Sequence, residues 1–481
     1  MGVTAAEIVN QLEDAYRAST ERLRSALREF IRTGARPDPV LRADGGFAYP
    51  EIRIEYNGAE PQATSALRSF GRLSSAGLFA STVTRPALFR KYLEAQLSIL
   101  MEKYGVTPTA ALSRQEIPFP YVIDGSDLDA GSVTTADIAR WFPTTELAHI
   151  GDEVADGTWD AQRSGHSPLA LFDALRTDFS LARLQHYTGT PVEHVQRYLL
   201  FTNYQRYVEE FVRWGAGQLK AGGRYSLLSG PGGMRLTPET ADPANLPDMT
   251  AARKSQMPAY HLVAENGTGI SIVNIGVGPS NAKTITDHLA VLRPEAWLMI
   301  GHCGGLRDSQ RIGDYVLAHA YLRDDHVLDP VLPPEIPIPP IAEVQQAFWS
   351  AAEQISGEEP EALKRRMRTG TIVTTDDRNW ELRYSESALR FSQSRAVGID
   401  MESATIAAQG YRYRVPYGTL LCVSDKPLHG ELKLPGQANR FYERAVREHI
   451  DIGIAAVDAL RDFGPKLHSR KLRAFDEPAF R

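Results

Sequence analysis

The sequence predicts an α/β fold: a central mixed sheet flanked by helices in the second half, preceded by an α+β N-terminal domain. In the second half, apolar runs such as Tyr417–Val423 alternate with helical stretches such as Met401–Tyr411, which is typical of strands buried between helices. In the first half, long amphipathic stretches are mixed with a strand of alternating polarity at Tyr49–Tyr56. These patterns predict two layered units along one chain.

Size and composition limit the possible classes of protein. The chain has 481 residues, with 53 Lys and Arg against 59 Asp and Glu, so its net charge of −6 does not favour nucleic-acid binding. No run approaches the roughly 20 apolar residues of a membrane span, and the N-terminus has no apolar signal core. Cys303 and Cys422 lie in apolar runs and predict reduced thiols. We therefore expect a cytoplasmic enzyme without nucleic-acid or membrane partners.

The first half contains four predicted elements before residue 110. Apolar residues at near-helical spacing predict a helix over Thr4–Thr33, which Gly34 ends. Tyr49–Tyr56 and Leu78–Thr84 read as strands, and a helix follows Arg85-Pro86.

Two further helical stretches are predicted at Leu169–Tyr187 and Val192–Leu219. Between and within them, the segment Arg183–Tyr207 is rich in Tyr, His and Arg. One interpretation is a helical hairpin with buried aromatics, and the other is that its Arg and Tyr side chains line a nucleotide or phosphate site.

A change of composition marks the expected domain boundary. Ala221–Met257 is rich in Gly and Pro, so we place an N-terminal domain at 1–220 and a second domain at 221–481. Tyr225–Ser229 is a candidate first strand of the second domain. The Gly230-Pro231-Gly232-Gly233 turn with Arg235 fits either a linker or an anion-binding loop.

The second domain opens with a predicted hairpin, Ala259–Glu265 and Gly269–Ile275 around Asn266-Gly267. Gly276-Val277-Gly278-Pro279-Ser280-Asn281 follows, without the third glycine of a dinucleotide-binding fingerprint. Trp297–Ile300 then reads as a buried strand leading into Gly-His-Cys-Gly-Gly-Leu, and another strand opens at Gly313.

Two acids stand at the ends of predicted elements. Glu402 lies in the first turn of the predicted helix Met401–Tyr411, and Asp425 follows the strand Tyr417–Val423. Because ligands bind at the carboxyl ends of strands in α/β sheets, we expect both carboxylates to face one crevice. The structural alternatives are a helix-dipole acid for Glu402 and a solvated strand-end acid or helix N-cap for Asp425.

Taken in order, these pieces resemble the purine nucleoside phosphorylase and nucleosidase superfamily. The matching motifs, over about residues 269–455, are GVGPSNA, GHCGGL, the Gly-Asp before a strand, Asp-Met-Glu-Ser and Val-Ser-Asp. Within it, RLQHYTGTPVEHVQRYLLFTNY and TTDDRNWEL resemble the AMP nucleosidase family. The resemblance implies a phosphorylase-like sheet, hydrolysis of AMP to adenine and ribose 5-phosphate, a homohexamer, activation by Mg-ATP and inhibition by phosphate. It implies no metal or cofactor for the chemistry.

The resemblance also implies roles for individual residues. Asp425 would be the general acid to the purine N7, with a pKa raised by burial, and Ser424 would position it. Glu402 would accept hydrogen bonds from the ribose 2′ and 3′ hydroxyls, whereas Asp400 would be structural. The residues expected to border the ribose are Met401, Gly276, Gly278 and Asn281.

Departures from the family pattern bear on the nucleophile and the base. Phosphorylases of the superfamily carry a phosphate-binding Arg where this chain has Met299, which argues for water as the nucleophile. His302, in place of the usual Ser, is a candidate for contacting water or ribose, or a structural histidine. Trp380 is the candidate for stacking on the purine. Arg378, or Lys426, is a candidate for the 5′-phosphate.

Two other functions stay open at this point. One is a purine nucleoside phosphorylase, or a nucleosidase acting on unphosphorylated nucleosides; the other is a non-catalytic nucleotide sensor. The sequence assigns no group to water activation or to the effector site, although Arg68, Arg72 and Arg85 are candidates in the first domain. The basic tail 466–481 is expected to be disordered or to dock on a neighbouring subunit.

Overall fold

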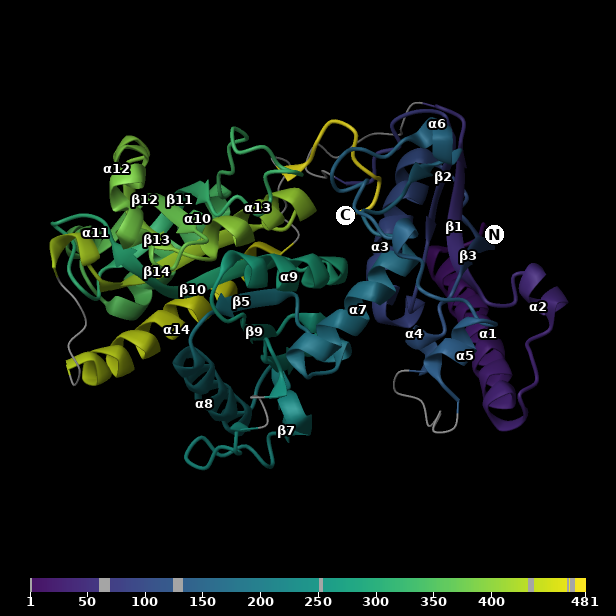
Figure 1. Ribbon diagram of the computed structural model, residues 1–481, viewed down its shortest axis with the longest axis horizontal. Coiled ribbons are helices and arrows are strands. Elements are labelled where there is room, and N and C mark those ends of the chain that lie inside the picture. The colour runs from purple at the N-terminus through teal and green to yellow at the C-terminus, as the bar shows by residue number, and fades with distance from the viewer. Residues whose placement is uncertain are drawn as a thin grey trace. The chain divides into compact units, whose positions relative to one another are not determined.

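The computed structural model describes residues 2–59, 70–123, 133–250, 254–430, 437–464, 467 and 472–481 (Figure 1). The chain divides into two compact units, Met1–Ala182 with Ala474–Arg481, and Arg183–Arg473. We had placed the boundary near residue 220. The division falls earlier because β5 (Tyr198–Thr202) pairs with two strands of the second unit, and α8 (Gln205–Ala221) packs on the same sheet.

The first unit is a four-stranded sheet with order β3-β1-β2-β4; α1 packs against the sheet, and α3 packs against α1. Its elements are α1 (Ala5–Thr33), α2 (Pro39–Ala43), β1 (Ala48–Tyr56), β2 (Gly77–Thr82), α3 (Pro86–Tyr104), β3 (Thr109–Glu116), α4 (Pro120–Ile123), α5 (Thr135–Ala139), α6 (Ala161–Ser164) and β4 (Ser167–Pro168); α7 (Ala174–Thr188) spans the division.

The long first helix forms as its sequence predicts. Thr4 and Glu7 make a reciprocal capping box at its start, and Gly34 ends it in a left-handed conformation. Its apolar stripe, including Leu23 and Leu27, is buried against Phe47 of the same unit. The predicted strands near residues 49–56 and 78–84 are confirmed as β1 and β2.

A buried carboxyl group lies inside this unit. Asp178 accepts hydrogen bonds from Tyr49 Oη at 2.6 Å and Thr84 Oγ1 at 2.8 Å, and Arg85 lies 3.6 Å from it. Burial raises the pKa of Asp178 to about 6, against the opposing effect of Arg85. Of the arginines considered for the effector site, Arg85 therefore lies beside this buried carboxyl group. Arg68 lies outside the described residues.

The last residues of the chain pack within the first unit. The Phe480 amide donates to the Leu169 carbonyl at 2.7 Å, and the Arg481 amide donates to Gln96 at 2.8 Å. Tyr92 donates to the Arg481 carbonyl at 2.8 Å. Residues 474–481 are thus ordered against their own chain, which differs from both expectations for the tail; 466 and 468–471 lie outside the described residues.

The second unit is built on a ten-stranded mixed sheet with order β13-β12-β11-β14-β10-β5-β9-β8-β6-β7. Its further strands are β6 (Tyr225–Gly230), β7 (Met234–Leu236), β8 (Ala259–Ala264), β9 (Ile270–Asn274), β10 (Ala296–Gly305), β11 (Tyr315–Asp324), β12 (Met367–Thr375), β13 (Ala396–Asp400) and β14 (Tyr417–Asp425). Its further helices are α9 (Pro279–Leu289), α10 (Ala342–Ser356), α11 (Pro360–Arg366), α12 (Tyr384–Gln393), α13 (Ser403–Tyr413) and α14 (Gln437–Phe463).

Helices cover both faces of this sheet, as expected. Residues of α8, α10 and α14 share one apolar cluster with the strands, and α9 packs beside α13 (Figure 1). The hairpin around Asn266-Gly267 is confirmed as β8 and β9, which pair antiparallel. Gly230–Gly233 forms the turn of the hairpin β6–β7, which gives the glycines a structural role.

The prediction of a continuous helix over Val192–Leu219 is wrong. Tyr198–Thr202 is a fully buried strand in the middle of the sheet, and the helix begins only at Gln205. The apolar run Tyr-Leu-Leu-Phe-Thr is short and rich in aromatic residues, and its pairing with β9 and β10 overrides the helical pattern of its neighbours.

Five strands of the second sheet close on themselves. β13 pairs with β12 and also, in antiparallel register, with the end of β10 at Gly304–Ile399 and Gly305–Gly398. A Cβ atom at Gly398 would lie 3.0 Å from Ile372 and 3.1 Å from Cys303, so the strands can approach this closely only because glycine is present. The ring β10-β14-β11-β12-β13 thereby brings the ends of β13 and β14 to the same level.

Two further expectations can be compared with the structure. Cys303 and Cys422 are both buried, and neither forms a disulfide, as predicted. Among the described residues, no helix combines the length and apolar character that a membrane crossing requires.

Candidate active site

Glu402 is the centre of the candidate site. Its side chain is fully buried, Oε1 accepts from the Gly278 amide at 2.6 Å and Oε2 accepts from Asn203 Nδ2 at 3.0 Å. Burial, and then the neighbouring Asp400 carboxylate, raise the pKa of Glu402. Such a carboxylate, held by two donors on separate oxygens, is oriented firmly and retains lone pairs for a ligand.

Asp400 holds the start of the following helix. It accepts from the Ser403 amide at 3.0 Å and from Thr374 Oγ1 at 2.6 Å, and Thr374 in turn accepts from the Ala404 amide at 2.8 Å. This capping fixes the position of Met401 and Glu402, which precede α13 rather than lying in its first turn as predicted. The structural role expected for Asp400 agrees with these bonds.

Asp425 is the last residue of β14 and is half-buried. Ser424 Oγ donates to Asp425 Oδ1 at 2.5 Å and lies 3.4 Å from the Cys303 carbonyl, so Ser424 orients the acid. Gly304 pairs with Asp425 on one side and with Ile399 on the other. Two strand spacings, about 10 Å, therefore separate the backbones at the ends of β14 and β13.

The turn after β9 supplies the other wall of the site. Gly278 has φ 116°, a conformation that favours glycine, and this conformation directs its amide to Glu402. Asn281 Nδ2 lies 3.1 Å from the position of a Cβ atom at Gly276, so this side chain closes the turn. A cavity of about 630 Å³ borders Asn203, Asn274 and Gly276 on this side, and neither Glu402 nor Asp425 is among its described lining residues.

His302 lies in a chain of buried hydrogen bonds. His449 Nε2 is 2.9 Å from the Leu420 carbonyl, Tyr207 Oη is 2.7 Å from His449 Nδ1, and His302 Nε2 is 3.2 Å from Tyr207 Oη. A carbonyl only accepts, and burial lowers the pKa of His449 to about 3, so neutral His449 donates to Leu420 and accepts from Tyr207. Tyr207 must then accept from His302, which carries its proton on Nε2.

His302 also contacts the segment that holds Glu402. Its ring lies 4.5 Å from the ring of Tyr204 in an edge-on arrangement, and Tyr204 is adjacent to Asn203. His302 is thereby placed next to the segment that holds Glu402.

Comparison with known proteins identifies the family to which this chain belongs. Residues 7–166 match the family described as bacterial AMP nucleoside phosphorylase N-terminus, and residues 234–458 match the phosphorylase superfamily. The chain is 60% identical over 481 residues, 100% of its own length and 99% of the relative, to a protein of Escherichia coli (strain K12) named AMP nucleosidase. The chain belongs to the AMP nucleosidase family.

More distant relatives cover smaller shares of the chain. A guanosine phosphorylase of Halorubrum lacusprofundi is 26% identical over 205 residues, 40% of this chain and 78% of the relative. The crystal structure of an AMP nucleosidase from Bacteroides thetaiotaomicron is 28% identical, covers 60% of this chain and 98% of that chain, and aligns with a TM-score of 0.43.

The remaining sequence candidates of this AMP nucleosidase family member have other contacts or are exposed. Trp380 packs against Phe391 at 5.9 Å in a small apolar cluster, and Arg378 is exposed. Lys426 is buried and donates to the Asp308 carbonyl at 3.0 Å, so it supports a loop instead of facing a phosphate. Met401 is partly exposed beside Glu402.

Asn203 and His449 were not identified as site residues from the sequence, and Tyr207 was included only as one of the tyrosines of the segment Arg183–Tyr207. Asn203 directly follows the apolar run of β5, and a polar residue at a strand end was the signal that could have found it. Their contribution depends on contacts between residues that are far apart in the sequence. Asn203 and Glu402 are 199 positions apart, and Tyr207 and His449 are 242 positions apart. Among the described residues, no group of three or more His, Cys, Asp or Glu is arranged to hold a metal.

Proposed function

We propose that this protein hydrolyses the N-glycosidic bond of AMP to give adenine and ribose 5-phosphate. The observation that carries the proposal is the buried Glu402, held by Asn203 and Gly278 at the strand ends where Asp425 also lies. The E. coli relative's name, AMP nucleosidase, supports the choice of substrate.

In this mechanism Asp425 is the general acid that protonates N7 of the leaving purine. The barrier to breaking the N-glycosidic bond is lower when the purine departs as a neutral molecule. A positioned general acid typically raises the rate roughly 10²–10⁴-fold. Ser424 orients the carboxyl group, and its bond to Asp425 supports this role.

Glu402 accepts hydrogen bonds from the ribose 2′ and 3′ hydroxyls, while Gly276, Gly278 and Asn281 border the sugar and Met401 packs on it. Positive charge develops on the ribose as the bond breaks, so a fixed carboxylate nearby favours the transition state over the ground state. The two donors that hold Glu402 keep it in place during this step.

Water is the proposed nucleophile. Met299 is fully buried and uncharged where phosphorylases of the superfamily place an Arg for the phosphate nucleophile. His302 is the proposed contact for water, since its proton on Nε2 is used by Tyr207 and its Nδ1 accepts. Trp380 and Arg378 stay proposals for the purine and the 5′-phosphate; both follow β12, which carries Thr374 beside Asp400.

The assembly and its regulation are part of the same proposal. By family resemblance the enzyme is a cytoplasmic homohexamer, activated by Mg-ATP and inhibited by phosphate, and needs no cofactor for the chemistry. Sedimentation velocity of the full chain measures the assembly, and AMP turnover with added Mg-ATP or phosphate measures the two effects.

Product analysis separates the proposal from its alternatives. Incubation with AMP should release adenine without phosphate, and phosphate should not accelerate the release. Faster cleavage with phosphate and formation of a sugar 1-phosphate would indicate a phosphorylase. Preference for adenosine over AMP would indicate a nucleosidase for unphosphorylated nucleosides, and AMP binding without adenine release would indicate a sensor.

A further inference from the structure

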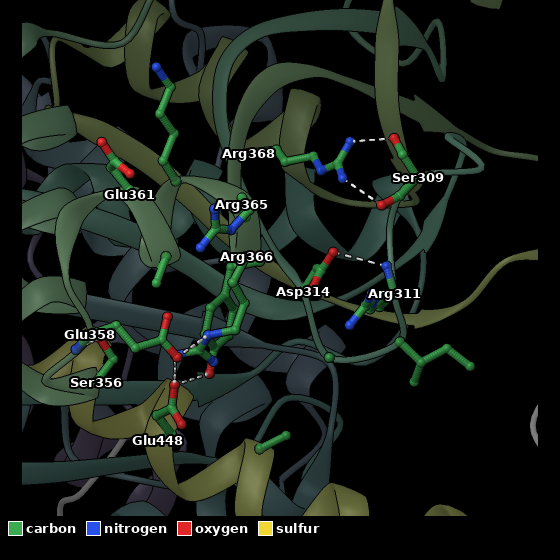
Figure 2. A pocket seen from close by; sticks show the side chains of 16 residues that line it. Ser309, Arg311, Asp314, Ser356, Glu358, Glu361, Arg365, Arg366, Arg368 and Glu448 are labelled. Carbon is green, nitrogen blue, oxygen red and sulfur yellow. Dashed lines mark hydrogen bonds and ion pairs between the residues drawn. The ribbon is translucent and has the colours of Figure 1, made fainter.

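The strand β11 has polar groups at both of its ends. At its start lies a cavity of about 1570 Å³, shown in Figure 2, whose lining carries five cations and four acids. Arg366 lies there 2.9 Å from Glu358 and 2.6 Å from Glu448, and charges that balance so nearly favour no class of ligand. The polar groups at the other end of β11 are buried, and one of them contacts the helix that follows Glu402.

Asp325 is the residue directly after β11, and it is buried. Its Oδ2 accepts from Thr405 Oγ1 at 2.6 Å, and its Oδ1 accepts from the Val327 amide at 3.3 Å. One oxygen of this carboxyl group therefore holds the loop after β11, and the other oxygen holds α13.

Three consecutive residues at the start of α13 are bonded to three different strand ends. The Ser403 amide donates to the last residue of β13, and the Ala404 amide donates to Thr374 of β12. Thr405 adds the bond to Asp325, directly beyond β11. Because β13, β12 and β11 are neighbours in the sheet, these bonds form a row across it. The first turn of α13 cannot turn or slide on the sheet without breaking one of them.

A buried arginine offsets the charge of Asp325. Arg323 lies two residues earlier in the chain, and its Nη1 donates to the Leu332 carbonyl at 2.7 Å. Burial raises the pKa of Asp325, whereas the hydrogen bonds from Thr405 and Val327 and the charge of Arg323 lower it. Removing one of two buried opposite charges leaves the other uncompensated and destabilises the fold strongly. A test of the contact between Asp325 and Thr405 must therefore leave both charges in place.

We propose that Asp325, acting through Thr405, is a positioning residue for Glu402. Glu402 directly precedes α13, and the donors that hold its carboxylate, Gly278 and Asn203, belong to other segments of the chain. A shift of α13 therefore moves the carboxylate away from these donors and from the ribose hydroxyls. This inference rests on the proposed function, in which Glu402 binds the ribose.

Thr405→Val tests the proposal, because it removes the hydroxyl donor and keeps the shape of the side chain. Displacing a group of the active site by about 1 Å can cost roughly 10²-fold in rate, so we expect kcat for adenine release from AMP to fall roughly 10–100-fold. KM should change much less, since Glu402 favours the transition state over the bound substrate. Thr405→Ser keeps the donor and should retain a kcat close to that of the wild type.

Two controls separate positioning from a general loss of stability. In the Glu402→Ala background no carboxylate is left to position, so Thr405→Val should lower kcat much less there than in the wild type. Thr286→Val removes another buried hydroxyl, which donates to the Ala282 carbonyl of its own helix at 2.6 Å, and should leave kcat unchanged. Circular dichroism and thermal unfolding verify the folding of each variant.

Hydrogen exchange of the full chain, read by mass spectrometry, measures how firmly the start of α13 is held. The first turn of α13 should exchange faster in Thr405→Val than in the wild type, Thr405→Ser or Thr286→Val. Three results would overturn the proposal: unchanged exchange in Thr405→Val, unchanged kcat in Thr405→Val, or an equal loss of kcat with and without Glu402. Absence of adenine release by the wild type would instead refute the proposed function, and the exchange comparison would still confirm or overturn the hold of Asp325 on α13.

Discussion

The hydrogen bond between Asn203 and Glu402 offers a quantitative test of the site. Asn203→Ala removes a 3.0 Å bond to a buried carboxylate. Hydrogen bonds to charged groups contribute about 1.5–3 kcal/mol, which corresponds to a fall in kcat/KM of roughly 10–150-fold if the bond is fully expressed in the transition state. The Gly278 amide still holds the other oxygen, so the fold should be retained.

Glu402→Gln completes a double-mutant cycle. The glutamine keeps an oxygen that accepts from the Gly278 amide, but it presents its side-chain NH2 group to Asn203. Asn203 Oδ1 is buried and has no hydrogen-bond partner among the described residues, so it can accept from this NH2 group after a flip of the Asn203 side chain. Part of the pair is thus restored, and Asn203→Ala should cost about 1–2 kcal/mol less in the Glu402→Gln background than in the wild type.

The assay is adenine release from AMP under kcat/KM conditions, with thermal unfolding of each variant as the control for folding. Two results would refute the reasoning. One is an Asn203→Ala enzyme within twofold of the wild type, and the other is an equal cost of Asn203→Ala in both backgrounds.

Three more predictions follow from the same contacts. Asp425→Asn should lower kcat for adenine release by about 10²–10⁴-fold with KM for AMP nearly unchanged, since it removes the proposed acid; near-normal turnover would exclude that role. Tyr207→Phe should lower the free energy of unfolding by about 1–3 kcal/mol and lower kcat more than it changes KM, because it leaves buried groups of His302 and His449 without their shared partner; an unchanged kcat would contradict this effect of the Tyr207 hydrogen bonds on the site. Stability should fall as pH rises from about 4 to about 6, because the pKa of Asp178 is raised to about 6 in the folded chain and the native state binds more protons in that window. The loss is up to about 3 kcal/mol, and Asp178→Asn should remove this slope in urea unfolding; the same slope in both proteins would show that another group is responsible.

Local patterns predicted much of this fold because local chemistry decides those parts. The capping box at Thr4 and the Asn266-Gly267 turn define their elements from within a few residues, and both are confirmed. The strand ending in Asp425 was also identifiable, since a continuous apolar run needs burial on both faces.

The parts that were missed depend on contacts between distant segments. The apolar run of β5 lies between helical patterns, and only its two neighbouring strands make it a strand. The two acids were expected together because strands of one sheet direct their carboxyl ends alike. In the structure β13 runs antiparallel to β10, and it is the pairing at Gly304 that brings Ile399 level with Asp425.

The closed ring of five strands also limits which sequence changes the site can tolerate during evolution. Because Gly304 is paired on both sides, the separation of the strand ends is set by hydrogen-bond register and not by loop length. Loops around the rim can therefore lengthen or exchange side chains, and so alter the preferred substrate, without moving either carboxylate. A one-residue slip of β13, by contrast, would turn every side chain of that strand to its opposite face and displace Glu402. The ring thus confines tolerated variation to the rim.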